Sequence, residues 1–348
     1  MASTVGIEQP TAKAERMALM TRQLRIEPDG VAIDATEHET ILQAARRSGV
    51  ALPYECGWGS CGSCKVTLVD GQVALIFPSA PAVNPRDARR NHILACQSRA
   101  VSDVTIARGA GDWSAPTPRC VEQQAILREV EHLAPEIRQF TFETAAPIDF
   151  RPGQYAILHL GEGLRRCYSM CNLPGSAILQ FIAKRYDGGH GSNTLAALQP
   201  GARITVEVPF GTCTLRRQPG RKVFVAGGTG LAPILSMIRE AAQTQLDFGS
   251  PVDVIYGARA PADLAAADML EAAIAHVAHS RYLPVVEQAP ASWPHAAGFI
   301  TDAIKATVTD PAAAEFYVAG PPVMVNAVKA LLRSADVPIT QVHYDSFG

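Results

Sequence analysis

The rhythm of apolar and polar residues changes twice along the chain and predicts three structural regions. In the first, residues 23–108, apolar positions alternate over 24–33 around an Asp-Gly turn, as in a β-hairpin. Residues 40–48 carry a helical period that ends at Gly49, a residue type common just past a helix. Further strands are predicted at 65–69 and 104–107. We therefore expect a small domain that combines a sheet with a helix.

The second region, residues 119–218, contains short alternating segments. Strands are predicted at 126–130, 137–143, 155–160, 179–183 and 204–208. Several short strands at close spacing favour an antiparallel β-barrel.

In the third region, residues 219–348, strands alternate with helices. The predicted strands are 222–226, 252–256, 282–286 and 316–319. The predicted helices are one that runs to 242 and others at 263–279, 301–308 and 323–334. This alternation is typical of a doubly wound parallel sheet, whose ligands bind at the carboxyl ends of the strands.

Two stretches fall outside these regions. Residues 1–22 lack the continuous apolar core of a signal peptide, so we expect a flexible leader. Residues 109–118 are rich in glycine and proline without periodicity, which predicts an interdomain linker. No run approaches the roughly 18 apolar residues that a membrane-spanning helix needs.

The composition, with 47% hydrophobic and 18% charged residues and a formal net charge of −2, is typical of a globular protein. Lysine and arginine are scattered, which argues against nucleic acid as a partner. Of the eight cysteines, four lack the regular spacing of a disulfide framework: Cys120, Cys167, Cys171 and Cys213. We therefore expect the protein in the reducing cytoplasm.

The other four cysteines form the most specific motif in the sequence. Cys56, Cys61 and Cys64 follow the C-x4-C-x2-C spacing of plant-type 2Fe-2S proteins, and Cys96 is the natural fourth ligand. The glycines at 57, 59 and 62 would bring the main chain close to a cluster, because glycine reaches positive φ at little cost. Zinc is the alternative, although zinc sites usually show two close cysteine pairs or histidine partners. Trp58 would be either a partner-docking anchor or a packed rim residue.

The hairpin, the crossing helix and the cysteine loop together resemble the β-grasp ferredoxins over residues 23–108. The second region resembles the flavin domain of the ferredoxin-NADP reductase superfamily, because Arg166-x-Tyr168-Ser169 is followed by Gly-Gly-x-x-Ser-x-x-Leu over 188–195. The resemblance implies that Arg166 neutralises the FAD pyrophosphate, that Tyr168 lies against the isoalloxazine ring and that Ser169 hydrogen-bonds its N5 edge. A short helix would face the phosphates with its N–H groups at Gly191, Ser192, Asn193 and Thr194.

The third region carries two loops that resemble the nicotinamide domain of the same superfamily. Their residues are Gly227, Gly228, Thr229 and Gly230 in the first loop and Gly320, Pro321 and Pro322 in the second. The first loop alone is weak evidence, because it is not the G-x-G-x-x-G fingerprint of dinucleotide binding. The superfamily usually places a cysteine just before the second loop, and Ala319 stands there in this chain. This departure removes one side chain that contributes to hydride transfer.

The C-terminus ends in aromatic residues. Related reductases stack a near-terminal aromatic ring on the flavin, and the resemblance makes Phe347 the first candidate and Tyr344 the second. The alternative is an aromatic ring that closes the core.

The choice of coenzyme depends on charges near the ribose, because the 2′-phosphate of NADPH needs cations. Arg259 follows the strand at 252–256 and is accompanied by Asp263, while Glu287 and Gln288 follow the strand at 282–286. Because no basic cluster is present at either point, the sequence favours NADH.

The order of the three domains resembles the reductase (electron-transfer) components of bacterial multicomponent oxygenases, among them the xylene and methane monooxygenase reductases and the benzoate dioxygenase reductases. The resemblance implies a multidomain oxidoreductase with a β-grasp (α+β) ferredoxin domain, an antiparallel β-barrel flavin domain and an α/β doubly wound nucleotide-binding domain. It would pass electrons from NADH through FAD and the 2Fe-2S cluster, one at a time, with Ser169 and Phe347 at the hydride-transfer site.

The implied acceptor is an oxygenase or hydroxylase component of aromatic or hydrocarbon oxidation, or an intermediate ferredoxin that binds transiently to a monomeric reductase. Two alternatives stay open. One is a reductase for a non-oxygenase partner such as a deoxysugar dehydrase. The other is a non-catalytic ferredoxin-like carrier.

Overall fold

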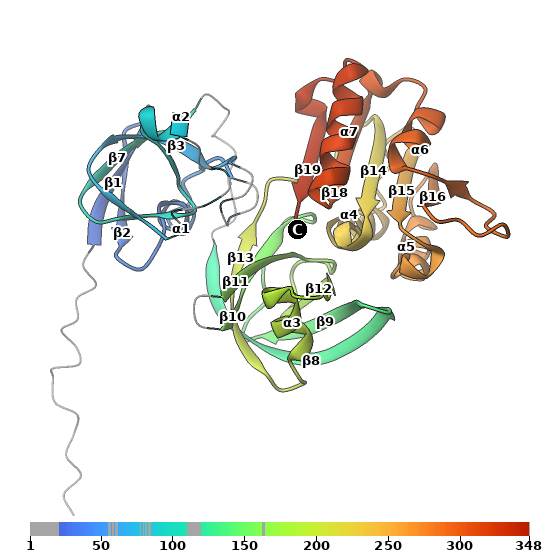
Figure 1. Cartoon of the computed structure of the whole chain (residues 1–348), viewed down its shortest axis with the longest axis horizontal. Helices are drawn as coiled ribbons and strands as arrows, with labels where there is room; N and C mark the ends of the chain where they lie inside the picture. The colour runs from blue at the N-terminus through green and yellow to red at the C-terminus, as the bar shows by residue number, and fades with distance from the viewer. Residues whose placement is uncertain are drawn as a thin grey trace, which may run out of the picture.

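A computed structural model of the chain describes residues 21–54, 57, 59, 62–76, 78, 80, 82, 85–109, 120–161 and 164–347. Residues 1–20 of the predicted leader and residues 110–118 of the predicted linker lie outside these residues. The predicted leader is two residues too long, because Thr21 and Arg22 already pair in the first strand of the sheet. Figure 1 shows an N-terminal sheet domain in blue and cyan, a barrel in green and a layered α/β domain in yellow to red. The three fold types expected from the sequence are thus confirmed.

The N-terminal domain is built on a mixed sheet in the order β2-β1-β7-β3-β5. Its strands are β1 (Thr21–Glu27), β2 (Val31–Thr36), β3 (Lys65–Asp70), β5 (His92–Leu94) and β7 (Val104–Ala107). β1 and β2 form the predicted hairpin, and β1 pairs in parallel with β7. A second, two-stranded sheet joins β4 (Val73–Leu75) to β6 (Ser98–Ala100). The short helix α2 (Pro85–Arg89) precedes β5.

Helix α1 (Ile41–Arg47) packs its apolar side into the core of this domain, together with Leu24 and Ile26 of β1. The helix starts where predicted because Thr40 forms a capping box: its side chain accepts from the Gln43 N–H, and the Gln43 side chain accepts from the Thr40 N–H. It ends just before Gly49, whose φ of 72° a residue with a side chain would adopt only at a cost.

The barrel domain has the strand order β11-β10-β13-β8-β9-β12. Its strands are β8 (Val121–Ala134), β9 (Ile137–Thr144), β10 (Tyr155–Gly161), β11 (Leu164–Ser169), β12 (Ile178–Lys184) and β13 (Arg203–Phe210). A bridge between Met170 and Phe181 brings the two edges of the sheet together. Helix α3 (His190–Ala197) follows β12. The sequence analysis did not assign the strand β11, although it carries the Arg-x-Tyr-Ser motif.

The C-terminal domain is a parallel sheet in the order β17-β16-β15-β14-β18-β19. Its strands are β14 (Arg221–Gly227), β15 (Val252–Ala258), β16 (Ser280–Val286), β17 (Ala296–Ala297), β18 (Ala314–Gly320) and β19 (Val342–Ser346). Its α-helices are α4 (Leu231–Gln243), α5 (Ala267–Ile274), α6 (Ile300–Thr307) and α7 (Pro322–Ser334). The strand order reverses between β14 and β18, which is where ligands bind in doubly wound sheets.

One predicted helix is wrong in extent. The segment 263–279 contains the end of a 3-10 turn (Pro261–Asp263) and then α5 alone, which begins at Ala267. The hydroxyl of Tyr256 donates to the carbonyl of Ala265, and Ala266 has a left-handed φ of 52°, so the chain cannot be helical there. No helix in the described part of the chain is long and apolar enough to cross a membrane.

Candidate functional site

Two of the four predicted cluster ligands lie within the described residues, and the fold brings them together. Cys64 directly precedes β3 and Cys96 closely follows β5, two antiparallel strands in which Lys65 pairs with Leu94. This register places the two thiols side by side, with 3.2 Å between their Sγ atoms. Both side chains are buried in the core of the N-terminal domain.

This arrangement fits a metal-bound pair of thiolates. Two thiolates on one tetrahedral metal atom sit about 2.3 Å from it, so they lie within about 4 Å of each other. The loop between the ligands has the predicted backbone, since Gly57, Gly59 and Gly62 have φ values of 70°, 99° and 76°. The other two predicted ligands, Cys56 and Cys61, lie outside the described residues, as does Trp58.

The flavin motif lies on β11, where Arg166 and Tyr168 are on the same face of the strand. The Arg166 side chain runs so close to the start of α3 that a Cβ added to Gly191 would lie 2.6 Å from its Cγ and 2.8 Å from its Nε. The glycine therefore lets the arginine lie against the first turn of the helix. Tyr168 meets Phe181 edge to face at 6.4 Å, and burial raises the pKa of Tyr168 to about 12.

The first turn of α3 fits an anion. The cap of this helix makes no side-chain hydrogen bond, so the N–H groups of its first turn lack that partner. Asn193 Oδ1 is buried and accepts no hydrogen bond from any described residue. Two predicted hydroxyl groups are engaged within the loop instead: Ser192 Oγ donates to Gly189 O, and Thr194 Oγ1 donates to His190 O.

Ser169, at the end of β11, reaches across to the C-terminal domain. Its hydroxyl donates to Asp345 Oδ2 at 2.7 Å, and both side chains are buried. Asp345 lies on β19, opposite Ala319 in the register of β18 and β19. The sequence analysis missed Asp345, although its position two residues before Phe347 was a usable signal.

The two glycine loops of the C-terminal domain meet at the switch point between β14 and β18. A Cβ added to Gly230 would lie 2.0 Å from the Ala319 carbonyl oxygen, so this contact requires glycine. The residues Gly228, Thr229 and Gly230 form a 3-10 turn that leads into α4, whose N-terminus therefore points toward the switch point. Gly227 is the last residue of β14.

The second loop and the end of the chain lie together. Phe347 N donates to Gly320 O at 3.2 Å, just past the pairing of Gly320 with Ser346. Phe347 is half-buried. Tyr344 instead packs against the sheet core, and the Lys329 ammonium of α7 lies 3.7 Å from its ring centroid. The geometry thus places Phe347 beside the loop of Gly320, Pro321 and Pro322 and gives Tyr344 a packing role.

The residues considered for coenzyme choice follow neighbouring strands. Ala258 pairs with Val286, so Arg259 and Glu287 emerge side by side, and both are exposed. Asp263 accepts from the Ala260 N–H and serves as a local cap.

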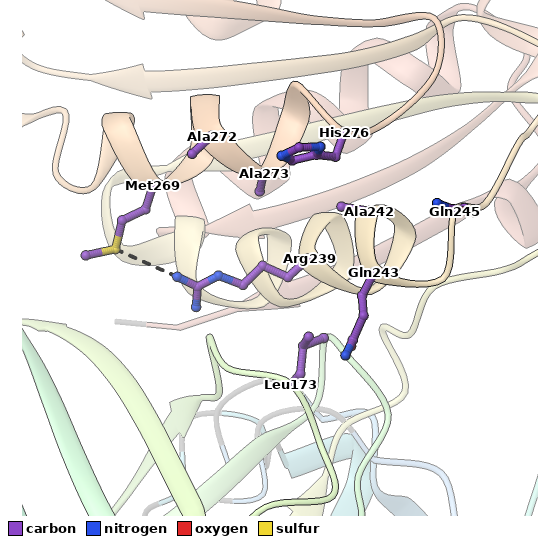
Figure 2. Close-up of a pocket in the computed structure, with 9 residues that line it drawn as sticks. All are labelled: Leu173, Arg239, Ala242, Gln243, Gln245, Met269, Ala272, Ala273 and His276. Atoms are coloured by element: carbon purple, nitrogen blue, oxygen red, sulfur yellow. Dashed lines mark hydrogen bonds between the residues drawn. The ribbon is translucent and has the colours of Figure 1, made fainter.

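A separate hollow of about 650 Å³ lies between α4 and α5 (Figure 2). Arg239 lies along it, donates to Cys171 O at 2.8 Å and approaches Met269 Sδ at 3.9 Å. Arg239 stands eight residues after Leu231, about 12 Å along the helix axis at 1.5 Å per residue. The hollow therefore lies away from the glycine loops.

Comparison with known families assigns a cofactor to each domain. Models match for a 2Fe-2S iron-sulfur cluster binding domain over residues 24–101, an oxidoreductase FAD-binding domain over 124–215 and an oxidoreductase NAD-binding domain over 224–330. The cysteine loop thus belongs to a 2Fe-2S protein and not to a zinc protein. The chain carries binding domains for a 2Fe-2S cluster, FAD and NAD.

Relatives match along nearly the whole chain. The ferredoxin–NAD(+) reductase component of the alkene monooxygenase system of Xanthobacter autotrophicus is 36% identical over 92% of this chain and 98% of its own length. The reductase component of propane 2-monooxygenase from Mycolicibacterium goodii is 32% identical over 94% and 97%.

Solved structures agree with these relatives. An Amycolatopsis cytochrome P450 reductase superposes with a TM-score of 0.85 at 27% identity, over 94% of this chain and 99% of that one. The ferredoxin reductase in carbazole 1,9a-dioxygenase gives 0.82 at 29% identity over the same shares. The chain therefore belongs to the family of ferredoxin–NAD(P)+ reductase components of oxygenase systems.

Proposed function

We propose that this protein takes electrons from NADH and delivers them singly to an oxygenase or hydroxylase component, or to an intermediate ferredoxin, in the oxidation of an aromatic or other hydrocarbon. The observation that carries the proposal is that the strand with the flavin motif, β11, contacts both other domains. Its Ser169 donates to Asp345 of β19, beside the loop proposed to bind nicotinamide, and its Cys167 packs against the domain of the cysteine loop. Both reported relatives serve oxygenase systems.

When bound, the three cofactors supply the redox chemistry, because FAD can accept two electrons from NADH and release them one by one to the cluster. The residues of the chain hold and orient them. Arg166 and the first turn of α3 neutralise the FAD pyrophosphate, with Asn193 Oδ1 as an acceptor for a cofactor hydroxyl. Tyr168 lies against the isoalloxazine ring.

Ser169 and Asp345 act together at the N5 edge of the flavin. The Ser169 proton is directed at the Asp345 carboxylate, so the hydroxyl oxygen keeps its lone pairs and would accept from the N–H that N5 bears in reduced flavin. Asp345 thereby fixes the orientation of the hydroxyl.

The nicotinamide coenzyme binds at the switch point of the C-terminal sheet. Its pyrophosphate approaches the N-terminus of α4, which is possible because the preceding loop is formed by Gly227, Gly228, Thr229 and Gly230. Gly320, Pro321 and Pro322 line the nicotinamide end, with Phe347 as the ring that covers the flavin until nicotinamide arrives. Ala319 contributes a methyl group where related proteins have a thiol. The exposed Glu287 beside Arg259 disfavours a 2′-phosphate, so NADH is the donor.

Cys56, Cys61, Cys64 and Cys96 are the cluster ligands, of which Cys64 and Cys96 already form a buried pair. The protein acts as a monomer that meets its acceptor transiently, and in the cytoplasm, where NADH is available.

The test uses the purified protein with its cofactors. NADH should reduce both ferricyanide and cytochrome c, with a higher kcat/KM than NADPH. Cys96→Ser removes one ligand, so cytochrome c reduction should be lost while ferricyanide reduction, which can start from the flavin, stays within about twofold of the parent. Cys120→Ser, outside the ligand set, is the matched control. Loss of both activities in Cys96→Ser would contradict the proposed electron path.

A further inference from the structure

The N-terminal domain packs against the outer face of β10, β11 and β13. Three barrel residues, Tyr155, Ile157 and Phe210, belong to the same buried cluster as the core of the N-terminal domain. The Phe210 ring stacks on Tyr155 at 5.8 Å and meets Tyr54 of the N-terminal domain edge to face at 5.9 Å. The Gly211 N–H donates to the Tyr54 hydroxyl at 2.8 Å. The two domains therefore share a continuous apolar core.

Because side chains alternate along a strand, β11 presents different residues to the barrel core and to the N-terminal domain. Arg166 and Tyr168 occupy one face, and Tyr168 packs against the core of the barrel. Cys167 occupies the other face and packs against the N-terminal domain. Gly57 of the cysteine loop lies so close to this outer face that an added Cβ would be 2.9 Å from Tyr155 Oη and 3.8 Å from Cys167 Sγ. Only the strand β11 thus separates Gly57 of the cysteine loop from the face that carries Arg166 and Tyr168.

A buried carboxylate stabilises the contact between the N-terminal domain and the barrel. Glu207 of β13 is only 3% exposed, and it accepts from Gln43 Nε2 of α1 at 2.5 Å. Within the barrel it meets His159 Nε2 at 2.6 Å and pairs with Arg165. Burial alone would raise the pKa of Glu207, but these hydrogen bonds and the Arg165 charge lower it below its ordinary value.

A second polar contact lies next to the first. Arg46, one helical turn beyond Gln43 on α1, is buried and donates to the Pro209 carbonyl of β13. Its guanidinium also lies 5.1 Å from the Phe210 ring centroid. Both contacts join α1 to β13, so they fix the N-terminal domain in position and in orientation.

We propose that Gln43 and Glu207 are positioning residues for electron transfer within the chain: their contact holds the cysteine loop against the outer face of β11, at a fixed distance from the flavin. This inference rests on the proposed function. The step that the contact serves moves one electron from reduced flavin to oxidised cluster. The flavin is oxidised by one electron, the cluster is reduced by one, and no bond between heavy atoms changes.

Gln43→Glu tests the contact with Glu207. The capping box of α1 is kept, because a glutamate side chain can accept from the Thr40 N–H as the glutamine does. At pH 8 it sets a second carboxylate against Glu207. We expect NADH-dependent flavin reduction and ferricyanide reduction to match the parent. Cluster reduction, followed by stopped-flow absorbance, should slow about tenfold or more, because the electron-transfer rate falls steeply as the flavin and the cluster move apart and is sensitive to their positioning. Small-angle X-ray scattering should show a larger radius of gyration.

Two further variants make the result specific. Gln43→Glu combined with Glu207→Gln restores a donor opposite an acceptor and should recover the cluster-reduction rate to within about threefold of the parent. Arg47→Gln changes the net charge of α1 by the same −1 but is exposed and pairs with Glu39 of its own domain, so it should behave as the parent. Iron content and the electron paramagnetic resonance signal of the reduced cluster should be the same in all variants, which shows that the N-terminal domain is intact.

A parental cluster-reduction rate and scattering profile in Gln43→Glu would overturn the positioning role. Failure of the double variant to recover would do so too. If NADH does not reduce the cluster of the parent protein, the proposed function itself fails, and that result is seen before any variant is compared.

Discussion

At the scale of single residues, one hydrogen bond joins the flavin strand to the C-terminal strand. Ser169 donates to Asp345 at 2.7 Å in a buried setting, so neither side chain turns freely. The bond spans 176 positions of sequence, which is why the motif at Ser169 predicted a site residue but gave no hint of its partner.

Removal of the Ser169 hydroxyl should slow flavin reduction. The proposed bond from the flavin edge to Ser169 forms as charge develops on the flavin during reduction, and a hydrogen bond to a charged group is worth about 1.5–3 kcal/mol. We therefore expect Ser169→Ala to lower the rate of flavin reduction by NADH about ten- to a hundredfold in stopped-flow measurements. Ser334→Ala removes an exposed hydroxyl that donates to Leu331 O of its own helix, and it should leave the rate unchanged. An unaltered rate in Ser169→Ala would exclude a role at the flavin.

At the scale of elements, three neighbouring strands of the parallel sheet are tied together by charge. Glu315 of β18 accepts from Lys222 of β14 on one side and contacts His343 Nε2 of β19 at 3.0 Å on the other. Burial alone would raise the pKa of Glu315, but hydrogen bonds from His343 and Lys222 outweigh it and lower the pKa to about 2. This link stabilises β19, the strand that carries Asp345 and leads to Phe347.

The depressed pKa has a definite sign for stability. The pKa of Glu315 is about 2 in the folded state and about 4.3 in the unfolded state. Its contribution to the free energy of unfolding is therefore complete above the unfolded pKa and is lost as the pH falls toward 2. Glu315→Gln should therefore lower the free energy of unfolding by about 1–3 kcal/mol at pH 7 and by less at pH 3. Urea unfolding followed by far-UV circular dichroism measures both.

The exposed Glu271 of α5 provides the control for that experiment. Glu271→Gln removes the same charge from a surface position and should shift the urea midpoint little at either pH. An effect of Glu315→Gln that is equal at both pH values would contradict the charge network as its cause.

At the scale of the whole molecule, we expect the N-terminal domain and the barrel to unfold together, because they share one buried core. Phe210 belongs to β13 of the barrel, yet its ring is fully buried in the core of the N-terminal domain. The packing that stabilises the end of β13 is thus the same packing that holds the N-terminal domain against the barrel.

Phe210→Ala should cost about 3–5 kcal/mol, the usual range for a buried phenylalanine. We expect differential scanning calorimetry to show the N-terminal domain unfolding as a separate, earlier transition. Phe142→Ala, in the barrel interior away from the interface, should lower barrel stability by a similar amount. If Phe210→Ala and Phe142→Ala gave the same calorimetric profile, the coupling through Phe210 would be refuted.

Much of the fold and of the site could be predicted because it depends on local spacing. Alternation predicts strands, a helical period predicts α1, and the spacing of Cys56, Cys61 and Cys64 is set by the size of a cluster. The misplaced helix at 263–279 shows the limit of this approach. A tertiary hydrogen bond from Tyr256 competes for the backbone there, and no local pattern records it.

The sequence by itself determined which chemical groups are present and in which domain each lies, since ligand spacing and glycine loops are properties of short segments. Only the tertiary structure decided which groups meet. Ser169 contacts Asp345 across two domains, and Gln43 meets Glu207 at a distance of 164 positions. Such contacts depend on strand register and on the packing of whole faces, which are fixed only when the chain as a whole buries its apolar surface.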